Sequence, residues 1–403
     1  MTTITQTDAS WRDDAAVIGL VSLAHASSHF AHLLLPLMFP KVIETFGFSY
    51  SELGLLMSVF FVVSGVGQAT AGFLVDRLGA RPVMFVALGT LALACLAAFF
   101  AQGYAGLMLS AALFGIGNCS FHPVDFTILN QRVSLPRLGY AFSAHGLTGN
   151  LGWAVAPVFM VGISSMFGWR AAYMAAACVF LGILALLVWM RDAIETKVVD
   201  RKVNDPHATH TLAFLKIPVV WWCFVFFFLS TMTLAIVQTF SVSILQAMHH
   251  VSFESATLTL TAYMLSAAAG IFLGGFVASR WPLHSDRVVG ACMTVAAIFM
   301  ALCGSGWFGG TATMVILAAT GLSIGVGGPS RDMMIKKATP KGATGRVYGM
   351  VYSGLDVGFA ISPLVFGVFM DRGWYGLTLV CGAGVLLLSV LVALGVGKRT
   401  QVA

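Results

Sequence analysis

Long apolar runs alternate with short polar connections along the whole chain. Each run is long enough for an α-helix to cross a hydrocarbon layer about 30 Å thick. The runs are continuously apolar and do not alternate residue by residue, so they predict helices that span a membrane and not a β-barrel. Twelve spans are expected, at residues 16–39, 52–75, 82–102, 106–130, 139–165, 170–190, 217–245, 256–279, 288–307, 311–335, 346–369 and 374–396.

The positive charges predict which side of the membrane each connection faces. With a cytoplasmic N-terminus, 18 of the 22 Lys and Arg residues fall in cytoplasmic segments. Lys41, Arg170 and Arg372 fall on the other side, and Arg331 lies inside a span. This asymmetry follows the positive-inside rule. We therefore expect a multi-pass protein of a bacterial inner membrane with both termini in the cytoplasm. Residues 1–10 lack the basic segment of a signal peptide, so the first span is expected to direct insertion.

The second half of the chain repeats features of the first. A shift of about 205 residues places Gly and Pro residues of the first half on Gly and Pro residues of the second, where backbone geometry demands them. The matched pairs are Gly72 with Gly275, Pro123 with Pro329, Gly139 with Gly345, Gly152 with Gly358, Pro157 with Pro363 and Gly168 with Gly373. The repeat predicts an all-α membrane protein with two pseudo-symmetric six-helix bundles, at 1–190 and 217–403, joined by a cytoplasmic linker at 191–216.

Composition narrows the class of protein further. Only 9% of the residues are charged, against roughly 25% in soluble domains. The seven Cys residues are scattered through apolar runs, so we interpret them as buried hydrophobic residues and not as disulfides or metal ligands. There is no GxxxxGK[ST] loop, so an ion gradient and not ATP is expected to supply energy. We expect a transporter and not an enzyme, with no cofactor and no nucleic-acid partner.

The stretch GFLVDRLGAR, residues 72–81, ends the second span. Gly72 would allow close helix approach, and Gly79 a turn with positive φ. Arg77 and Arg81 would anchor the cytoplasmic side. Asp76 ends its own helix, where the helix dipole disfavours an anion, so it needs a partner elsewhere.

This signature resembles that of the major facilitator superfamily of secondary transporters, and the resemblance extends over essentially the whole chain. It implies transport by alternating access. It also implies that Asp76 contacts the start of the eleventh span together with an Arg at the end of the fourth, for which Arg132 is the matching residue. Such contacts would hold the cytoplasmic side closed; the alternative is that the signature serves only as a topology anchor.

A narrower similarity lies in the fourth and fifth spans. FHPVDF at 121–126 and HGLTGNLGWAVAP at 145–157 resemble the fosmidomycin-resistance-type branch of the superfamily. Multidrug antiporters place a Gly directly before the Pro of the fifth span, whereas Ala156 precedes Pro157 here. This departure speaks against a multidrug transporter.

Polar residues within the fourth and tenth spans are candidates for function, because a charge at the bilayer centre costs about 2.5–3.5 kcal/mol even on the mildest scale. Asn118, His122 and Asp125 are spaced to share one helical face, beside Pro123, which interrupts the hydrogen-bond ladder. Arg331 is the repeat equivalent of Asp125. We hypothesise that Asp125 and Arg331 pair to close an inner gate; the alternatives are that Arg331 binds an anionic substrate or pairs locally with the adjacent Asp332.

Three histidines share one face of the first span: His25, His29 and His32. A proton relay and substrate hydrogen bonding are the favoured roles, since imidazole exchanges protons near neutral pH. Packing against neighbouring carbonyl groups is the alternative. We expect no metal, because this face offers neither carboxylate nor thiolate.

The remaining candidates are spread over three spans. Asp356 in the eleventh span is a candidate proton carrier or a structural hydrogen-bond partner, and Gln238 in the seventh is a candidate substrate ligand. His145 is a weaker site candidate. The glycines of the fifth span predict close helix contact; they are Gly146, Gly149 and Gly152.

These features favour a proton-coupled carrier of a small organic solute, with an anion preferred because the pocket candidates include an Arg and several His. Proton coupling is preferred to sodium because the membrane interior contains five His and three acids. The alternative is a proton-driven exporter of drugs or toxic metabolites of the fosmidomycin-resistance type. A receptor or channel is disfavoured, because a protein that does not cycle has no need of the signature around Asp76. The expected partners are the solute, the proton and the lipid bilayer, and a monomer is expected.

Overall fold

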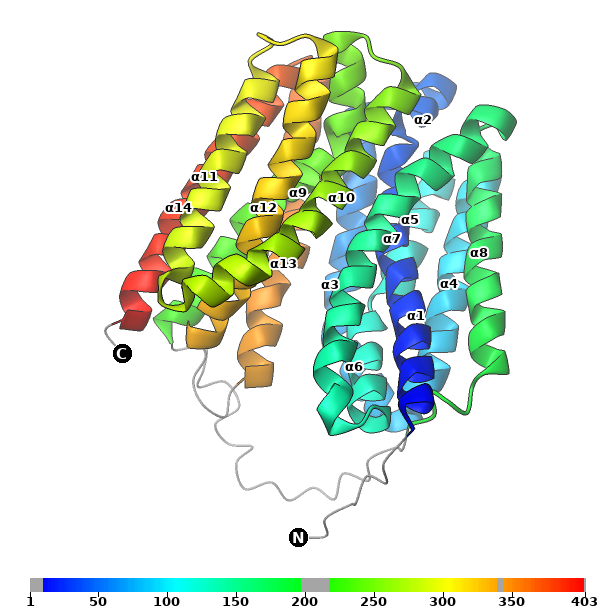
Figure 1. Ribbon diagram of the computed structural model, residues 1–403. Coiled ribbons are helices and arrows are strands. Elements are labelled where there is room, and N and C mark those ends of the chain that lie inside the picture. Colours follow the sequence, from blue (N-terminus) through cyan, green and yellow to red (C-terminus); the bar gives the residue numbers. More distant parts are fainter. Residues whose placement is uncertain (1–9, 197–216, 339–343, 402–403) are drawn as a thin grey trace. The chain divides into compact units, whose positions relative to one another are not determined.

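The computed structural model describes residues 10–196, 217–338 and 344–401. Regular structure in these ranges is helical (Figure 1). Residues 197–216, most of the predicted linker, lie outside the described residues. The α-helices are α1 (Trp11–Leu37), α2 (Phe39–Phe46), α3 (Tyr50–Leu78), α4 (Ala80–Phe100), α5 (Tyr104–Asn118), α6 (Phe121–Arg132), α7 (Leu138–Phe167), α8 (Trp169–Trp189), α9 (Pro218–His249), α10 (Phe253–Arg280), α11 (Ser285–Gly304), α12 (Gly310–Ala338), α13 (Thr344–Asp371) and α14 (Tyr375–Gln401), with short 3-10 turns at Leu135–Arg137 and Pro282–His284.

Twelve helical segments in the described part of the chain are long and apolar enough to cross a membrane. This confirms the predicted number of spans. Two of these spans contain more than one α-helix: α1 and α2 make up Trp11–Phe46, and α5 and α6 make up Tyr104–Arg132. In a hydrocarbon environment a helix satisfies its own backbone hydrogen bonds, which is why the apolar runs adopt this structure.

The fourth span is interrupted between α5 and α6. Pro123 lies in the first turn of α6, where it has no N–H to donate to the carbonyl of Cys119 and its ring crowds that carbonyl. The break lies beside Pro123, where the sequence predicted an interrupted hydrogen-bond ladder. Asn118 ends α5, whereas His122 and Asp125 lie on α6.

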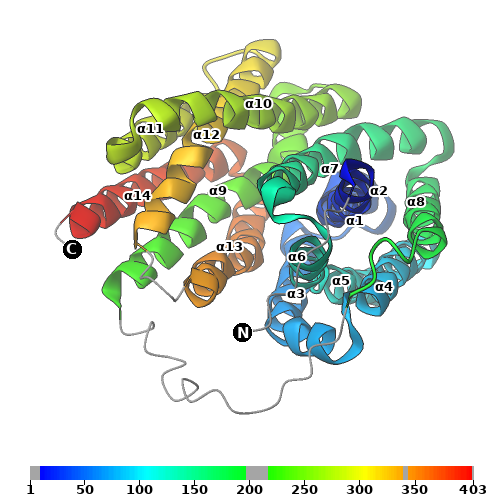
Figure 2. The same cartoon turned by 60° about the horizontal axis from the view of Figure 1, so that its bottom comes forward.

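The described residues form two compact units. The first covers 10–35 and 62–196 and contains α1, most of α3 and α4 to α8. Figure 2 shows α1 within a ring of α5, α6, α7 and α8. This placement agrees with the deep burial of α1 residues such as Val21, Ala24 and Leu33, and with a hydrogen bond of 3.0 Å from the Tyr173 hydroxyl to the Leu34 carbonyl.

The second unit covers 36–61, 217–338 and 344–401. Its helices pack closely through small residues: a Cβ added at Gly325 would lie 2.1 Å from the Ala267 carbonyl oxygen, so α10 and α12 are in backbone contact. Residues 36–61, which we placed in the first bundle, belong to this unit. The reason is contact with α13, because the Ser58 hydroxyl donates to the Ala360 carbonyl at 2.6 Å.

The signature stretch follows the prediction at one glycine and departs from it at another. Gly79 has φ of 84°, as the predicted turn requires. Among the described residues of the first unit, a Cβ added at Gly72 would meet nothing within 4 Å. Close helix approach at Gly72 therefore has no partner within that unit and, like its gating role, stays a prediction.

Candidate functional site

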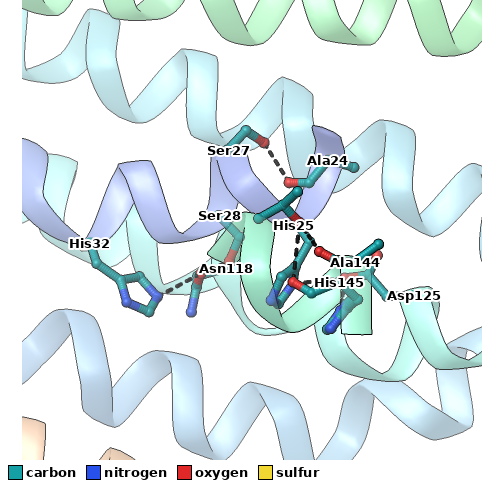
Figure 3. A network of polar contacts seen from close by, with 10 residues as sticks. Ala24, His25, Ser27, Ser28, His32, Asn118, Asp125, Ala144 and His145 are labelled. Carbon is teal, nitrogen blue, oxygen red and sulfur yellow. Dashed lines mark hydrogen bonds and ion pairs between the residues drawn. The ribbon is translucent and has the colours of Figure 1, made fainter. Parts of the chain in front are cut away.

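Asp125 is the centre of a buried polar network in the first unit (Figure 3). Its Oδ2 atom lies 3.0 Å from Nδ1 of His25 on α1 and 3.1 Å from Nε2 of His145 on α7. An ionised carboxylate accepts only, so both imidazoles donate to it. The two rings stack with centroids 3.5 Å apart. Three helices are thus joined through one carboxylate oxygen.

The other oxygen of Asp125 is also buried. Oδ1 has no hydrogen-bond partner within the described part of the chain, and Asp125 is 0% exposed. A buried carboxylate oxygen without a partner carries a substantial desolvation cost. The nearby His122 ring lies 5.2 Å from that of His25 and 6.0 Å from that of His145, and its residue is exposed. The network therefore has a buried acidic centre and an accessible imidazole at its edge.

A second part of the network surrounds Asn118. Its Oδ1 accepts from the Ser28 hydroxyl at 2.6 Å and lies 3.1 Å from His32 Nε2, and its Nδ2 donates to the Ser64 hydroxyl at 2.9 Å. The Trp153 indole donates to His32 Nδ1 at 3.3 Å. Because Nδ1 accepts, His32 must carry its proton on Nε2. Both nitrogens of His32 are thus used in structural bonds.

His29 lies between these two parts. Its ring centroid is 4.6 Å from that of His25 and 4.3 Å from that of Trp153, and its Nδ1 is buried without a partner in the described residues. Gly149 makes room for this arrangement, since an added Cβ would lie 2.8 Å from His29 Cε1 and 3.1 Å from His25 Nε2.

The predicted close contact of the fifth span is confirmed at two of its three glycines. Gly149 faces the histidines, and a Cβ at Gly152 would lie 2.1 Å from the Ala26 carbonyl oxygen. A Cβ at Gly146 would meet no described residue of the first unit within 4 Å, so close contact at this glycine is not found within the unit. Sequence reasoning gave His145 little weight and missed Trp153 and Ser28. The spacing of His145, Gly149 and Gly152 along one face of α7 was the available signal.

Arg331 lies in the second unit. Its Nε donates to Asp332 Oδ1 at 2.9 Å, and its guanidinium carbon lies 5.1 Å from the centre of the Phe227 ring. The local pair with Asp332 is one of the three arrangements considered from the sequence. Asp125 and Arg331 each have these contacts within their own unit, and the proposed gate between them stays a prediction.

Two further candidates of the second unit are placed but not linked to a network. Gln238 is buried on α9, with its Nε2 unpartnered among the described residues. Asp356 is partly buried on α13, two residues from both Gly354 and Gly358. These glycines contact α9, since a Cβ at Gly358 would lie 2.8 Å from the Phe228 carbonyl oxygen. Asp356 therefore points away from α9.

Two arginines at the predicted cytoplasmic side contact the segment that follows α8. Arg81 Nη2 lies 3.5 Å from Glu195 Oε1, and Arg132 Nη2 donates to the Asp192 carbonyl at 3.2 Å. The amide of Ala80 donates to the Thr196 hydroxyl at 2.8 Å. The end of the first unit is thus held to the signature turn, an arrangement that the sequence did not indicate.

Comparison with known proteins gives the family. The family model described as Major Facilitator Superfamily matches residues 21–257 and 228–402. The chain belongs to this superfamily. It is therefore a multi-pass membrane transporter and not an enzyme, and the resemblance drawn from the signature stretch is confirmed.

Individual relatives are distant. The chain is 22% identical over 399 residues to the probable sulfoacetate transporter SauU of Cupriavidus necator, covering 94% of this chain and 92% of the relative. It is 25% identical over 280 residues to the fosmidomycin resistance protein of Escherichia coli, covering 67% and 66%. Two further curated relatives are matched over only 39% and 66% of their own length. A bacterial homologue of the human lysosomal transporter Spinster shares the fold, with a TM-score of 0.75, 14% identity, and coverage of 98% of this chain and 97% of that one.

Proposed function

We propose that this chain is a proton-coupled transporter of a small organic anion that works by alternating access. The observation that carries the proposal is the contact of one buried carboxylate, Asp125, with two imidazoles from different helices. Ionisable groups inside a membrane are expensive to maintain and mark ion or proton pathways. His25, His122, Asp125 and Asp356 are the groups that we assign to proton coupling.

Protonation at this site would change the helix contacts. Asp125 Oδ2 accepts from both His25 and His145 while it carries no proton. A proton placed on Oδ2 would turn this oxygen into a donor, so at least one of these bonds would be lost or reversed. Because His25 lies on α1 and His145 on α7, a single proton would alter how α6 is bonded to both helices. This is the kind of two-state element that couples an ion to a conformational change.

An anionic substrate is supported by Arg331 and by the names of relatives. The Arg331 side chain is 32% exposed and lies over the Phe227 ring. SauU is named for sulfoacetate, and a hexuronate transporter of Bacillus subtilis is 23% identical over 384 residues, with 90% of this chain covered. Both names denote organic acids. We assign substrate binding to His25, His29, Asn118, His122, Gln238 and Arg331.

Transport into proteoliposomes tests the proposal. With an imposed pH gradient, the wild-type protein should accumulate at least one acid from a panel of labelled organic acids. Asp125→Asn should abolish accumulation and retain exchange of internal for external substrate, because an amide holds no transferable proton. Glu44→Gln, on an exposed side chain of α2, is the matched control and should accumulate normally. Absence of accumulation in the wild type would refute the function, and accumulation by Asp125→Asn would refute the role of Asp125.

The gating hypothesis has its own test. Asp76, Arg77, Gly79, Arg81 and Arg132 are proposed to hold the cytoplasmic side closed, together with a pair between Asp125 and Arg331. Arg331→Ala should abolish or uncouple transport, and a charge exchange of Asp125 and Arg331 should restore part of it. No recovery in the exchanged variant would count against the pair.

A drug or toxic-metabolite exporter of the fosmidomycin-resistance type is the second candidate. The match to the Escherichia coli fosmidomycin resistance protein favours it. In cells, expression of this chain should then raise fosmidomycin tolerance, with no accumulation of organic acids in proteoliposomes.

The proposed setting is a bacterial inner membrane, with a monomeric carrier and both termini in the cytoplasm. Alkaline phosphatase fused to the C-terminus should be inactive, and fusion after Arg170 should be active, because that enzyme works only outside the cytoplasm. The opposite pattern would contradict this orientation.

A further inference from the structure

We propose that His25, His122 and His145 form a binding site for a divalent transition-metal ion, represented by Zn²⁺. One ring nitrogen from each of the three residues lies within 4.8 Å of the others. The ligands come from α1, α6 and α7, all within the first unit. Three imidazoles with an open fourth position make a known type of zinc coordination.

Metal binding requires the rings to rearrange. Tetrahedral Zn–N bonds of 2.0–2.1 Å place ligand nitrogens roughly 3.4 Å apart, so nitrogens now up to 4.8 Å apart must converge by about 1.4 Å. The stacked rings of His25 and His145 must also turn relative to each other, so that both lone pairs point at the ion. His122 is the exposed member of the group and is the ring with most room to turn. Its exposure also gives the ion a route of entry.

Asp125 supplies the support that metal-binding imidazoles require. Its Oδ2 holds one nitrogen of His25 and one of His145, which is how carboxylates orient metal ligands and raise their basicity. Its Oδ1 is buried without a partner in the described residues, so the carboxylate keeps acceptor capacity beyond the two imidazole bonds.

The geometry also explains why the histidines of the first span, taken alone, do not predict a metal site. His32 has both nitrogens committed to Trp153 and Asn118. His29 is not part of the group. The acid that the first span lacks comes from α6, and the third imidazole comes from α7. Imidazole ligands favour zinc, nickel or copper, whereas Mg²⁺ prefers oxygen ligands.

Direct binding of Zn²⁺ tests the site without reference to transport. The five histidines outside the network would first be replaced by Asn, to remove adventitious binding; they are His207, His210, His249, His250 and His284. This variant, purified in detergent and stripped with chelator, should bind one Zn²⁺ per chain by calorimetry and elemental analysis. Mg²⁺ at the same concentration should not bind.

Substitutions in that background separate the proposed ligands from their neighbours. His122→Ala, at an exposed residue, should abolish stoichiometric binding, and Asp125→Asn should weaken affinity about 10–100-fold. His29→Gln is the matched control, because its ring touches the same cluster but is not a ligand; it should retain one ion. Size-exclusion chromatography checks that each variant is folded. His145→Gln, which removes another proposed ligand, replaces His122→Ala if that variant does not fold. The site is refuted by no binding in the background, by unchanged binding in His122→Ala, or by equal loss in His29→Gln.

Discussion

Gly149 of α7 should tolerate an added methyl group poorly, because it faces the histidine network. An added Cβ would lie 2.8 Å from His29 Cε1, 2.9 Å from His29 Nδ1 and 3.1 Å from His25 Nε2. Normal contacts between such atoms are about 3.5–4.0 Å, so both rings must retreat by several tenths of an ångström. Overpacking of this size costs about 1–3 kcal/mol. His25 cannot retreat freely, because its Nδ1 is bonded to the buried Asp125 at 3.0 Å.

Gly149→Ala should therefore lower both stability and transport, and Gly146→Ala is the matched control. Gly146 lies three residues earlier on the same helix, and its added Cβ would meet no atom of the described residues within 4 Å. In soluble helices a harmless Gly→Ala change stabilises by roughly 0.5–1 kcal/mol, so the control should be neutral or stabilised. The assays are the thermal unfolding midpoint in detergent and the initial transport rate in proteoliposomes at equal reconstitution. Equal behaviour of the two variants would refute the account of the packing at His25 and His29.

Two further predictions concern hydrogen bonds that do not involve Asp125. Asp371→Ala should lower the free energy of unfolding by about 0.5–2 kcal/mol. The reason is that the Asp371 carboxylate accepts from the backbone amides of Tyr50 at 2.5 Å and Ser51 at 2.9 Å, at the start of α3. An unchanged unfolding midpoint would contradict this capping role. Trp153→Phe keeps an aromatic ring against His29 and removes the hydrogen-bond donor to His32 Nδ1. The free energy of unfolding should fall by about 1 kcal/mol in the same assay. An unchanged value would show that this bond does not hold His32.

The histidine network shows what residue spacing within one span can predict and what it cannot. The spacing of His25, His29 and His32 placed them on one face, and the structure brings all three into a single network. Spacing could not assign different roles to them. His32 is bonded at both nitrogens, His25 reaches a carboxylate, and His29 has an unpartnered nitrogen within the part of the chain described here. These differences come from Trp153, Asn118 and Asp125, which lie 86 to 121 residues away along the chain.

The sequence by itself determined the class of fold, the number of spans and the family. Hydrophobic length and the signature at 72–81 are local properties, and the membrane imposes helices on any apolar run of sufficient length. The tertiary structure decided which polar residues meet. Asp125, assigned from the sequence to a pair with Arg331, contacts His25 and His145 through α1 and α7. Which side chains meet between distant helices depends on how closely the helices pack. At residues such as Gly149 and Gly152 the lack of a side chain sets this separation. The local sequence pattern does not specify the distance between two helices.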